Sequence, residues 1–129
     1  MKKLCFVMVG SNDLLASSKF YDAVFVPLDI IKVYTGKNYI GSAPKNNPEE
    51  IEFYITKPFN KEPATYGNGT QISLLANSTE AVDKFHTIAL ENGGTSEGSP
   101  GIRSGDYYAY VRDLDGNKIC ALTRINKII

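Results

Sequence analysis

The sequence has few of the residues that mark several large protein classes. Only two cysteines, Cys5 and Cys120, occur among 129 residues, so no disulfide framework is expected. Basic and acidic residues balance at 14 each, which leaves no excess positive charge for a nucleic-acid partner. No apolar stretch is long enough to cross a membrane. We therefore expect a protein that binds neither nucleic acid nor membrane.

What the chain does contain is typical of one globular domain. Hydrophobic residues make up 43 % of the chain and charged residues 22 %, enough for folding without disulfides or metal clips. The length suits a single domain over residues 1–129. Because both cysteines lie in apolar, strand-like segments, we expect buried, reduced thiols and a cytoplasmic location.

The first sixty residues begin with a strand and a helix. The apolar run from Leu4 to Val9 is short for a signal sequence, and we expect a fully buried strand there. Asn12-Asp13 then supplies a helix N-cap. Apolar residues recur at helical spacing from Leu14 to Leu28, until Pro27 ends the helix.

Three short strands complete this half. They are expected at Ile30 to Tyr34, Tyr39 to Ser42 and Ile51 to Lys57, where β-branched and aromatic residues gather. The segment from Ala43 to Glu49 holds two prolines and two asparagines, so we expect a loop. The segment from Lys61 to Thr70 has no periodicity and is expected to link two halves.

The second half repeats the strand and the helix. A strand is expected from Gln71 to Ala76. Asn77 and Glu80 have the spacing of a capping box, and the following helix is expected to end at Gly93-Gly94.

The remaining residues predict a loop and a hairpin. Glycine-rich Thr95 to Gly105 is expected to be a loop. Strands at Asp106 to Arg112 and Asn117 to Arg124 are joined through Asp115-Gly116, a strong hairpin signal.

The two halves therefore repeat one unit, and an offset of 65 residues superimposes Phe20 on Phe85. We predict an α+β fold with two βαβββ modules, over residues 1–60 and 71–129, joined by a link at 61–70. Together they form a cupped, incompletely closed eight-stranded sheet with the helices outside. The concavity of that sheet is the expected binding site.

Three segments, VGSNDL (9–14), SKFYD (18–22) and YAYVRDLDGNK (108–118), carry a resemblance to a known family. They resemble the glyoxalase / bleomycin-resistance / dioxygenase family, the vicinal oxygen chelate superfamily. The resemblance spans nearly the whole chain and implies the same paired βαβββ fold. It also implies a homodimer, in some members with halves exchanged between subunits.

Enzymes of that family hold one divalent metal in the concavity, with one ligand from each of four strands. The resemblance places those positions at Phe6, Gln71, Cys120 and near Tyr54, with Glu52 the alternative for the last. A phenyl ring donates no lone pair, an amide is a weak ligand, and one thiolate does not make a site. The sole histidine, His86, lies on the second helix. We therefore expect no catalytic metal and no other cofactor.

The same positions predict a pocket for a small, flat, partly polar molecule, because aromatic rings stack and a few polar groups fix orientation. Arg103 either clamps a carboxylate or phosphate of the ligand with its planar fork, or lies in solvent, or pairs with an acidic residue such as Glu97. The expected pocket residues are Phe6, Met8, Tyr54, Gln71, Arg103, Tyr108, Tyr110 and Cys120.

Three functions remain open from the sequence. The first is metal-free binding of a small organic molecule. The second, implied by the resemblance, is a divalent-metal-dependent lyase, isomerase, thiol transferase or dioxygenase. The third is an interaction protein whose concavity is filled by its own aromatic side chains. Open sheet edges and the apolar segment Ile125–Ile129 favour a homodimer in each case.

Overall fold

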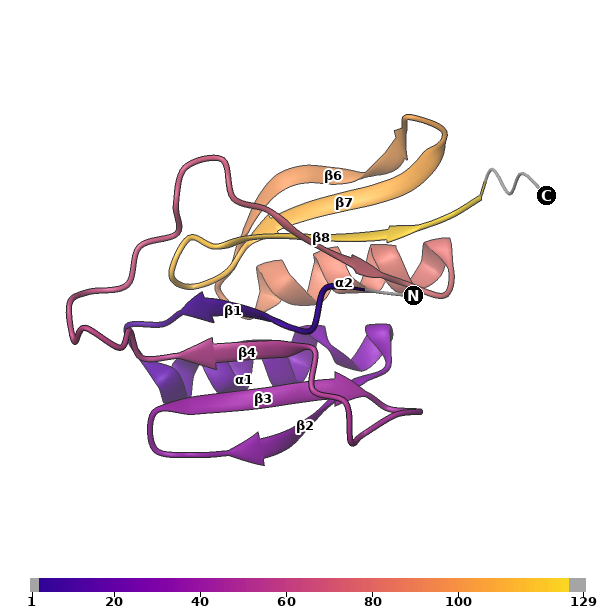
Figure 1. Cartoon of the computed structure of the whole chain (residues 1–129). Coiled ribbons are helices and arrows are strands. Elements are labelled where there is room, and N and C mark those ends of the chain that lie inside the picture. The colour runs from indigo at the N-terminus through magenta and orange to yellow at the C-terminus, as the bar shows by residue number, and fades with distance from the viewer. Residues whose placement is uncertain (1–2, 126–129) are drawn as a thin grey trace.

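The computed structural model describes residues 3–125 and contains the two βαβββ modules that the sequence predicts (Figure 1). Residues 126–129 of the apolar C-terminal segment lie outside this range. The first module comprises β1 (Val7–Gly10), α1 (Leu14–Val24), the short 3₁₀ helix η1 (Val26–Leu28), β2 (Ile30–Thr35), β3 (Tyr39–Pro44) and β4 (Phe53–Thr56). The second comprises β5 (Ile72–Leu75), α2 (Thr79–Glu91), β6 (Thr95–Arg103), β7 (Asp106–Arg112) and β8 (Lys118–Thr123).

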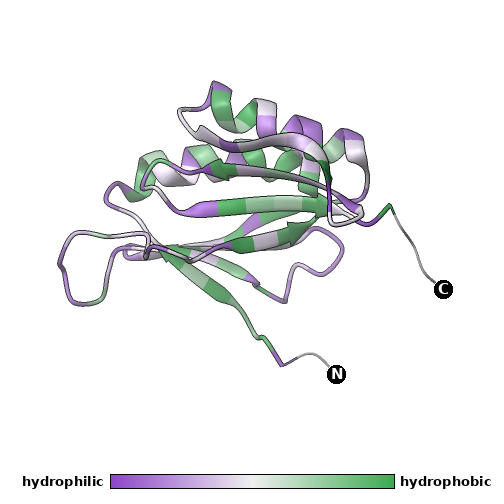
Figure 2. Ribbon diagram, turned by 90° about the horizontal axis from the view of Figure 1, so that it is seen from above, coloured by the Kyte–Doolittle hydropathy of each residue, from purple (hydrophilic) through white to green (hydrophobic). Residues whose placement is uncertain are grey.

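Each module folds its strands into one mixed sheet with the same topology. The strand orders are β1-β4-β3-β2 and β5-β8-β7-β6. The first and last strands of each module run parallel, and the other neighbours run antiparallel. The two sheets lie side by side without closing a barrel, and Figure 2 shows both helices on one side of the strands. The other face of the sheets, called the open sheet face below, has no helix over it.

Helix α1 begins where the sequence predicts and ends earlier. The side chain of Asp13 accepts a hydrogen bond from the backbone N–H of Ala16, as an N-cap should. The helix ends at Val24 because a residue before proline disfavours the α conformation, so Val26 and Pro27 form the separate turn η1.

Helix α2 starts one residue later than a capping box at Asn77 requires. Ser78 is the N-cap and accepts from the backbone N–H of Ala81. The amide of Asn77 instead donates to Asp29 of the first module, 3.0 Å away, so the predicted box with Glu80 is wrong. The helix ends as predicted, because Gly93 has a φ of 97° that glycine adopts without strain.

The predicted loop at Thr95 to Gly105 is wrong, because strand β6 occupies Thr95–Arg103 and pairs with β7. Two register shifts, on either side of Gly98, absorb the extra residues as bulges. A Cβ atom at Gly98 would lie 2.8 Å from the Tyr110 ring, so glycine is needed where strand and ring meet.

The core forms one cluster that both modules share. Its fully buried members come from α1, α2 and the sheets, and include Phe20, Phe25, Val82, Phe85 and Val111. One continuous core between helices and sheets makes the two modules a single packed unit. Within residues 3–125, neither helix is long and apolar enough to span a membrane.

The amino-terminal strand is not fully buried, which corrects the sequence-based expectation. Only Val9 of the run is buried, whereas Phe6 and Met8 are each 46 % exposed and Leu4 is 77 % exposed. The alternation of a strand sends these side chains to the open sheet face, away from the core. Cys5 is exposed as well, so only Cys120 is a buried thiol.

A buried polar junction joins the modules where the Asp-Leu-Asp-Gly-Asn turn meets the start of α1. The carboxylate of Asp113 accepts from the hydroxyl of Tyr21 at 2.5 Å and from the amide of Asn117 at 2.9 Å. The carboxylate of Asp115 accepts from the backbone of Asn12 and from the hydroxyl of Ser17. The turn motif thus serves as an inter-module joint.

The link between the modules, residues 61–70, is also held in place by specific contacts. The side chain of Asn12 exchanges two hydrogen bonds with the backbone of Ala64, at 2.7 and 3.3 Å. The guanidinium of Arg112 lies 5.1 Å from the centre of the Tyr66 ring. A Cβ atom at Gly116 would stand 2.7 Å from that ring, so the link packs closely on the β7–β8 turn.

Candidate functional site

Strand registers determine which predicted site residues share the open sheet face. Tyr110 lies opposite Cys120 across β7 and β8, and Ser73 of β5 lies opposite Cys120 on its other side. Tyr54 of β4 lies opposite Met8 of β1. The neighbours of these residues in each strand are buried in the core or packed against it, so their own side chains point to the open sheet face.

On the first sheet, four aromatic side chains form a continuous row. The Phe6 ring meets Tyr54 edge-on at 4.9 Å between ring centres, Tyr54 meets Tyr39 at 5.7 Å, and Tyr39 stacks on Tyr34 at 5.4 Å. We call these four residues the aromatic row. Sequence reasoning placed only Phe6 and Tyr54 in the site. It missed Tyr39 and Tyr34, whose proximity depends on the pairing of β2, β3 and β4.

On the second sheet, two tyrosines stand beside two cations. The rings of Tyr108 and Tyr110 are parallel within 6°, with centres 5.9 Å apart. The Arg103 guanidinium lies 5.2 Å and the Lys118 ammonium 5.1 Å from the centre of the Tyr110 ring. Cations near an aromatic face are attracted by its quadrupole. Sequence reasoning missed Lys118, because the hairpin register decides that it flanks Tyr110.

Arg103 is held in place by the backbone of its own hairpin. Its guanidinium donates to the carbonyl of Tyr108 at 2.9 Å and to the carbonyl of Ser99 at 2.7 Å. The alternative pairing with Glu97 is wrong, because Glu97 accepts from Arg112 at 3.1 Å instead. Arg103 therefore braces the bulged part of β6 while its cation faces Tyr110.

The thiol of Cys120 belongs to a short polar chain between β5 and β8. The amide of Gln71 donates to the hydroxyl of Ser73 at 3.1 Å, and Ser73 hydrogen-bonds the thiol. Burial raises the pKa of Cys120, and the Ser73 bond and the charge of Lys118 offset that effect only in part. Cys120 is thus a neutral thiol at physiological pH and a poor nucleophile.

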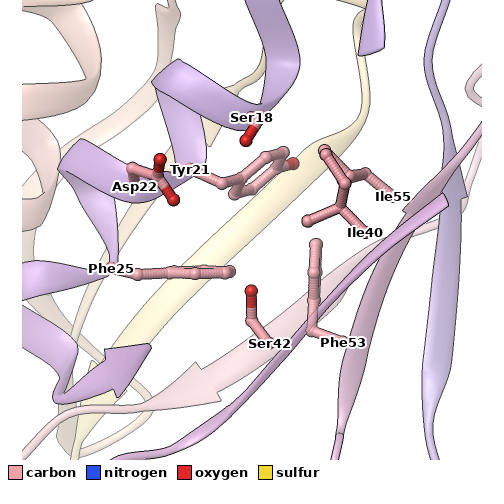
Figure 3. A pocket seen from close by; sticks show the side chains of 8 residues that line it. All are labelled: Ser18, Tyr21, Asp22, Phe25, Ile40, Ser42, Phe53 and Ile55. Atoms are coloured by element: carbon pink, nitrogen blue, oxygen red, sulfur yellow. The ribbon is translucent and has the colours of Figure 1, made fainter. Parts of the chain in front are cut away.

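An enclosed cavity in the first module is too small for an organic ligand. It measures about 10 Å³, and Figure 3 shows the hydroxyls of Ser18 and Ser42 pointing into it. Such a volume suits about one water molecule. Its lining belongs to the core between α1 and the first sheet: Ser18, Tyr21, Asp22, Phe25, Ile40, Ser42, Phe53 and Ile55.

A larger open cleft of about 780 Å³ lies where the two modules meet. Its walls mix apolar groups, such as Leu28 and Leu74, with polar ones, and the hydrogen bond from Asn77 to Asp29 crosses it. Glu52, just before β4, also contributes to its lining, whereas Tyr54 does not. Sequence reasoning did not find this cleft, because the shape of the cleft depends on the path of residues 43–49.

With this geometry established, known structures show what the chain resembles. A crystal structure of a glyoxalase/bleomycin resistance protein from Albidiferax ferrireducens superimposes with a TM-score of 0.83. The two sequences are 47 % identical, over 92 % of this chain and 96 % of that chain. The chain belongs to the glyoxalase/bleomycin resistance protein family. No protein-family model and no curated protein sequence matches this family member.

More distant structures share the fold of this family member. A glyoxalase/bleomycin resistance protein/dioxygenase family enzyme from Burkholderia phytofirmans has a TM-score of 0.74 at 18 % identity, over 96 % of this chain and all of that chain. A lactoylglutathione lyase from Agrobacterium tumefaciens has a TM-score of 0.67 at 17 % identity, over 95 % and 94 %. At these identities the likeness extends to the fold alone.

The resemblance assigns this family member four metal-ligand positions, and the residues there do not fit a divalent cation. Phe6 has no donor atom, Gln71 is already bonded to Ser73, and Cys120 is a neutral buried thiol. At the fourth position the Tyr54 ring packs in the aromatic row, and the alternative residue Glu52 lines the cleft between the modules. Within residues 3–125, no group of three His, Cys, Asp or Glu side chains is placed to hold a metal.

The sole histidine of this family member does not add a metal ligand to these four positions. His86 is 9 % exposed on α2, on the helix side of the sheets, and its Nε2 lies 2.8 Å from the hydroxyl of Ser96. His86 therefore lies away from the open sheet face.

Proposed function

We propose that this family member binds a small, planar organic molecule on its open sheet face without a catalytic metal. The observation that carries this proposal is the pair of aromatic platforms at that face. The aromatic row lies on one sheet and the Tyr108–Tyr110 stack on the other, next to the family's usual metal positions. Planar ligands stack on such rings, and nearby polar groups fix their orientation.

The chemistry at the metal positions supports binding over metal catalysis. A phenyl ring at Phe6, an amide at Gln71 and a thiol at Cys120 offer packing and neutral hydrogen bonds. The competing hypothesis is a divalent-metal-dependent lyase, isomerase, thiol transferase or dioxygenase. Metal analysis of the purified protein separates the two. We expect less than stoichiometric zinc, nickel, manganese and iron, and one tightly bound ion per chain would favour the enzyme.

We also propose a cytoplasmic homodimer in which a second copy covers part of the open sheet face. Leu75 is 66 % exposed and lies on this face with Met8, and the two residues belong to the edge strands β5 and β1. Covering apolar side chains and free strand edges stabilises an oligomer. Sedimentation should show a dimer, and Met8→Glu should shift it toward monomer. A monomer at all concentrations would contradict the proposal.

The binding proposal is tested with a neutral aromatic probe, 2-naphthamide. Titration calorimetry should detect saturable binding, and Tyr110→Leu should weaken it severalfold, because a stacking surface is lost. Leu90→Ala, on the outer part of α2, is the control and should bind as the parent does. If neither the parent nor the control binds the probe, and a broad set of planar compounds gives no thermal stabilisation, the concavity is filled by its own side chains.

A further inference from the structure

We infer that the open sheet face selects an aromatic anion and that the ammonium of Lys118 binds the ligand's carboxylate. This inference rests on the proposed function and adds the charge of the ligand. It starts from the different partners of the half-buried basic side chains.

Three basic side chains within residues 3–125 are half-buried: Arg103, Arg112 and Lys118. Arg112 pairs with Glu97 at 3.1 Å, and Arg103 donates to two backbone carbonyls. Lys118 is half-buried, yet within residues 3–125 it forms no ion pair and no side-chain hydrogen bond. A half-buried ammonium without a counter-ion favours an incoming anion, because the pair forms where water is partly excluded.

The neighbourhood of Lys118 adds positive charge and no negative charge. Arg103 faces the same Tyr110 ring, and its two backbone bonds keep its guanidinium in place. Glu97 lies on β6, which β7 separates from the Lys118 strand β8, and it is already paired with Arg112. Two cations at one ring, in a chain whose total charge is balanced, make this corner locally positive.

The same corner supplies the apolar surface and the neutral hydrogen-bonding groups that a planar anion needs. Tyr108 and Tyr110 present a stacked pair of rings beside the cations. Gln71 and Lys118 directly precede the paired residues Ile72 and Ile119, so they lie at the same end of neighbouring strands. A ligand with its ring against the tyrosines therefore brings a carboxylate to Lys118, with the Gln71 amide alongside.

The roles of the two cations differ. Arg103 already donates to two carbonyls and acts as a positioning residue for Tyr110. Lys118 has all three N–H donors available for a ligand. We assign the carboxylate to Lys118 and predict that charge at this position, more than its exact shape, sets selectivity.

Two isosteric probes test the inference, 2-naphthoate with a carboxylate and 2-naphthamide with a neutral amide. The parent protein should bind naphthoate about tenfold more tightly at low salt, the usual effect of one charged hydrogen bond. Lys118→Met keeps the apolar stem and should reduce that ratio to about one. Lys118→Arg should keep most of the preference. Added salt should lower naphthoate binding selectively.

Lys84→Met is the matched control, since Lys84 lies on α2 and pairs with Glu80. It should leave both affinities unchanged. If the parent binds both probes equally, or Lys118→Met keeps the preference, the inference is wrong while the proposed function stands. If the parent binds neither probe, the inference is wrong, and the proposed function is wrong as well if a broad set of planar compounds gives no thermal stabilisation.

Discussion

The hydroxyl of Tyr21 in the first module donates a 2.5 Å hydrogen bond to the carboxylate of Asp113 in the second. Both side chains are buried, and Asp113 also accepts from the backbone and the amide of Asn117. A buried carboxylate needs such donors, because burial without them is costly. The bond therefore ties the packing of α1 to the β7–β8 turn.

Removal of this bond should destabilise the whole domain. Tyr21→Phe keeps the ring and leaves Asp113 with one donor fewer, so we expect a loss of about 1–3 kcal/mol in the free energy of unfolding. Urea denaturation followed by circular dichroism measures it. Tyr107→Phe is the control, because Tyr107 bonds Asp83 at the surface, and it should change stability little. An equal effect of both substitutions would contradict a special role for the junction.

The same tyrosine should make the protein sensitive to alkali. Burial, and then the charge of Asp113, raise the pKa of Tyr21 well above its usual value. Above about pH 10 the unfolded chain loses this proton while the folded chain keeps it, so stability falls as pH rises. The stability difference between pH 9 and 11 should be smaller in Tyr21→Phe than in the parent. Identical pH profiles for the two proteins would rule the assignment out.

His86 should produce the opposite dependence in mild acid. Burial lowers the pKa of His86, and the charge of Asp83 opposes this in part. As pH falls below about 6.5, the unfolded chain takes up a proton before the folded chain does, and stability decreases until the folded pKa is reached. The melting temperature should drop between about pH 7.5 and 5.5, and His86→Gln should drop less. Since it is the sole histidine, its NMR signal gives the folded pKa directly.

Gly94 should not tolerate a side chain, because the modules approach closely there. A Cβ atom would lie 2.7 Å from the carbonyl oxygen of Arg112 and 2.9 Å from the Phe20 ring. Gly94→Ala should cost about 1–3 kcal/mol through overpacking. Gly101→Ala, whose Cβ meets only one atom at 4.0 Å, should be nearly neutral in the same thermal or urea assay. A well-tolerated alanine at 94 would mean that the modules separate readily.

The two thiols should react differently with a disulfide reagent such as Ellman's. Cys5 is exposed, whereas Cys120 is buried with a raised pKa. One thiol should therefore react quickly in the native protein and the second only after denaturation. Cys5→Ser should abolish the fast phase. A fast phase that survives in this variant would show that Cys120 is accessible.

Local patterns were enough to predict the order of helices and strands, because each element begins or ends at a strong signal. The cap at Asp13, the stop at Gly93 and the turn at Gly116 all act within a few residues of sequence. Strand β6 escaped prediction because Gly98 and Pro100 look like loop residues. Long-range pairing with β7 outweighs that local preference.

The site was harder to predict than the fold. Between Leu4 and Val9 every residue is apolar, so the alternation between core and open face is hidden in the sequence. Parity along the strands was enough to gather Tyr108, Tyr110 and Cys120 on one face. It does not reveal that Lys118 contacts Tyr110, because the two residues are diagonal neighbours on the adjacent strands β8 and β7 and the contact depends on the conformation of the lysine side chain.

The contacts that hold the link in place have a consequence for the exchange of modules between chains. The side chain of Asn12 hydrogen-bonds the backbone of Ala64, and the Tyr66 ring packs against Gly116 of the same chain. Exchange of modules between two chains would require both contacts to break first. We therefore expect two labelled, folded samples to keep their own modules when they are mixed, and we expect any exchange to arise during refolding at high concentration.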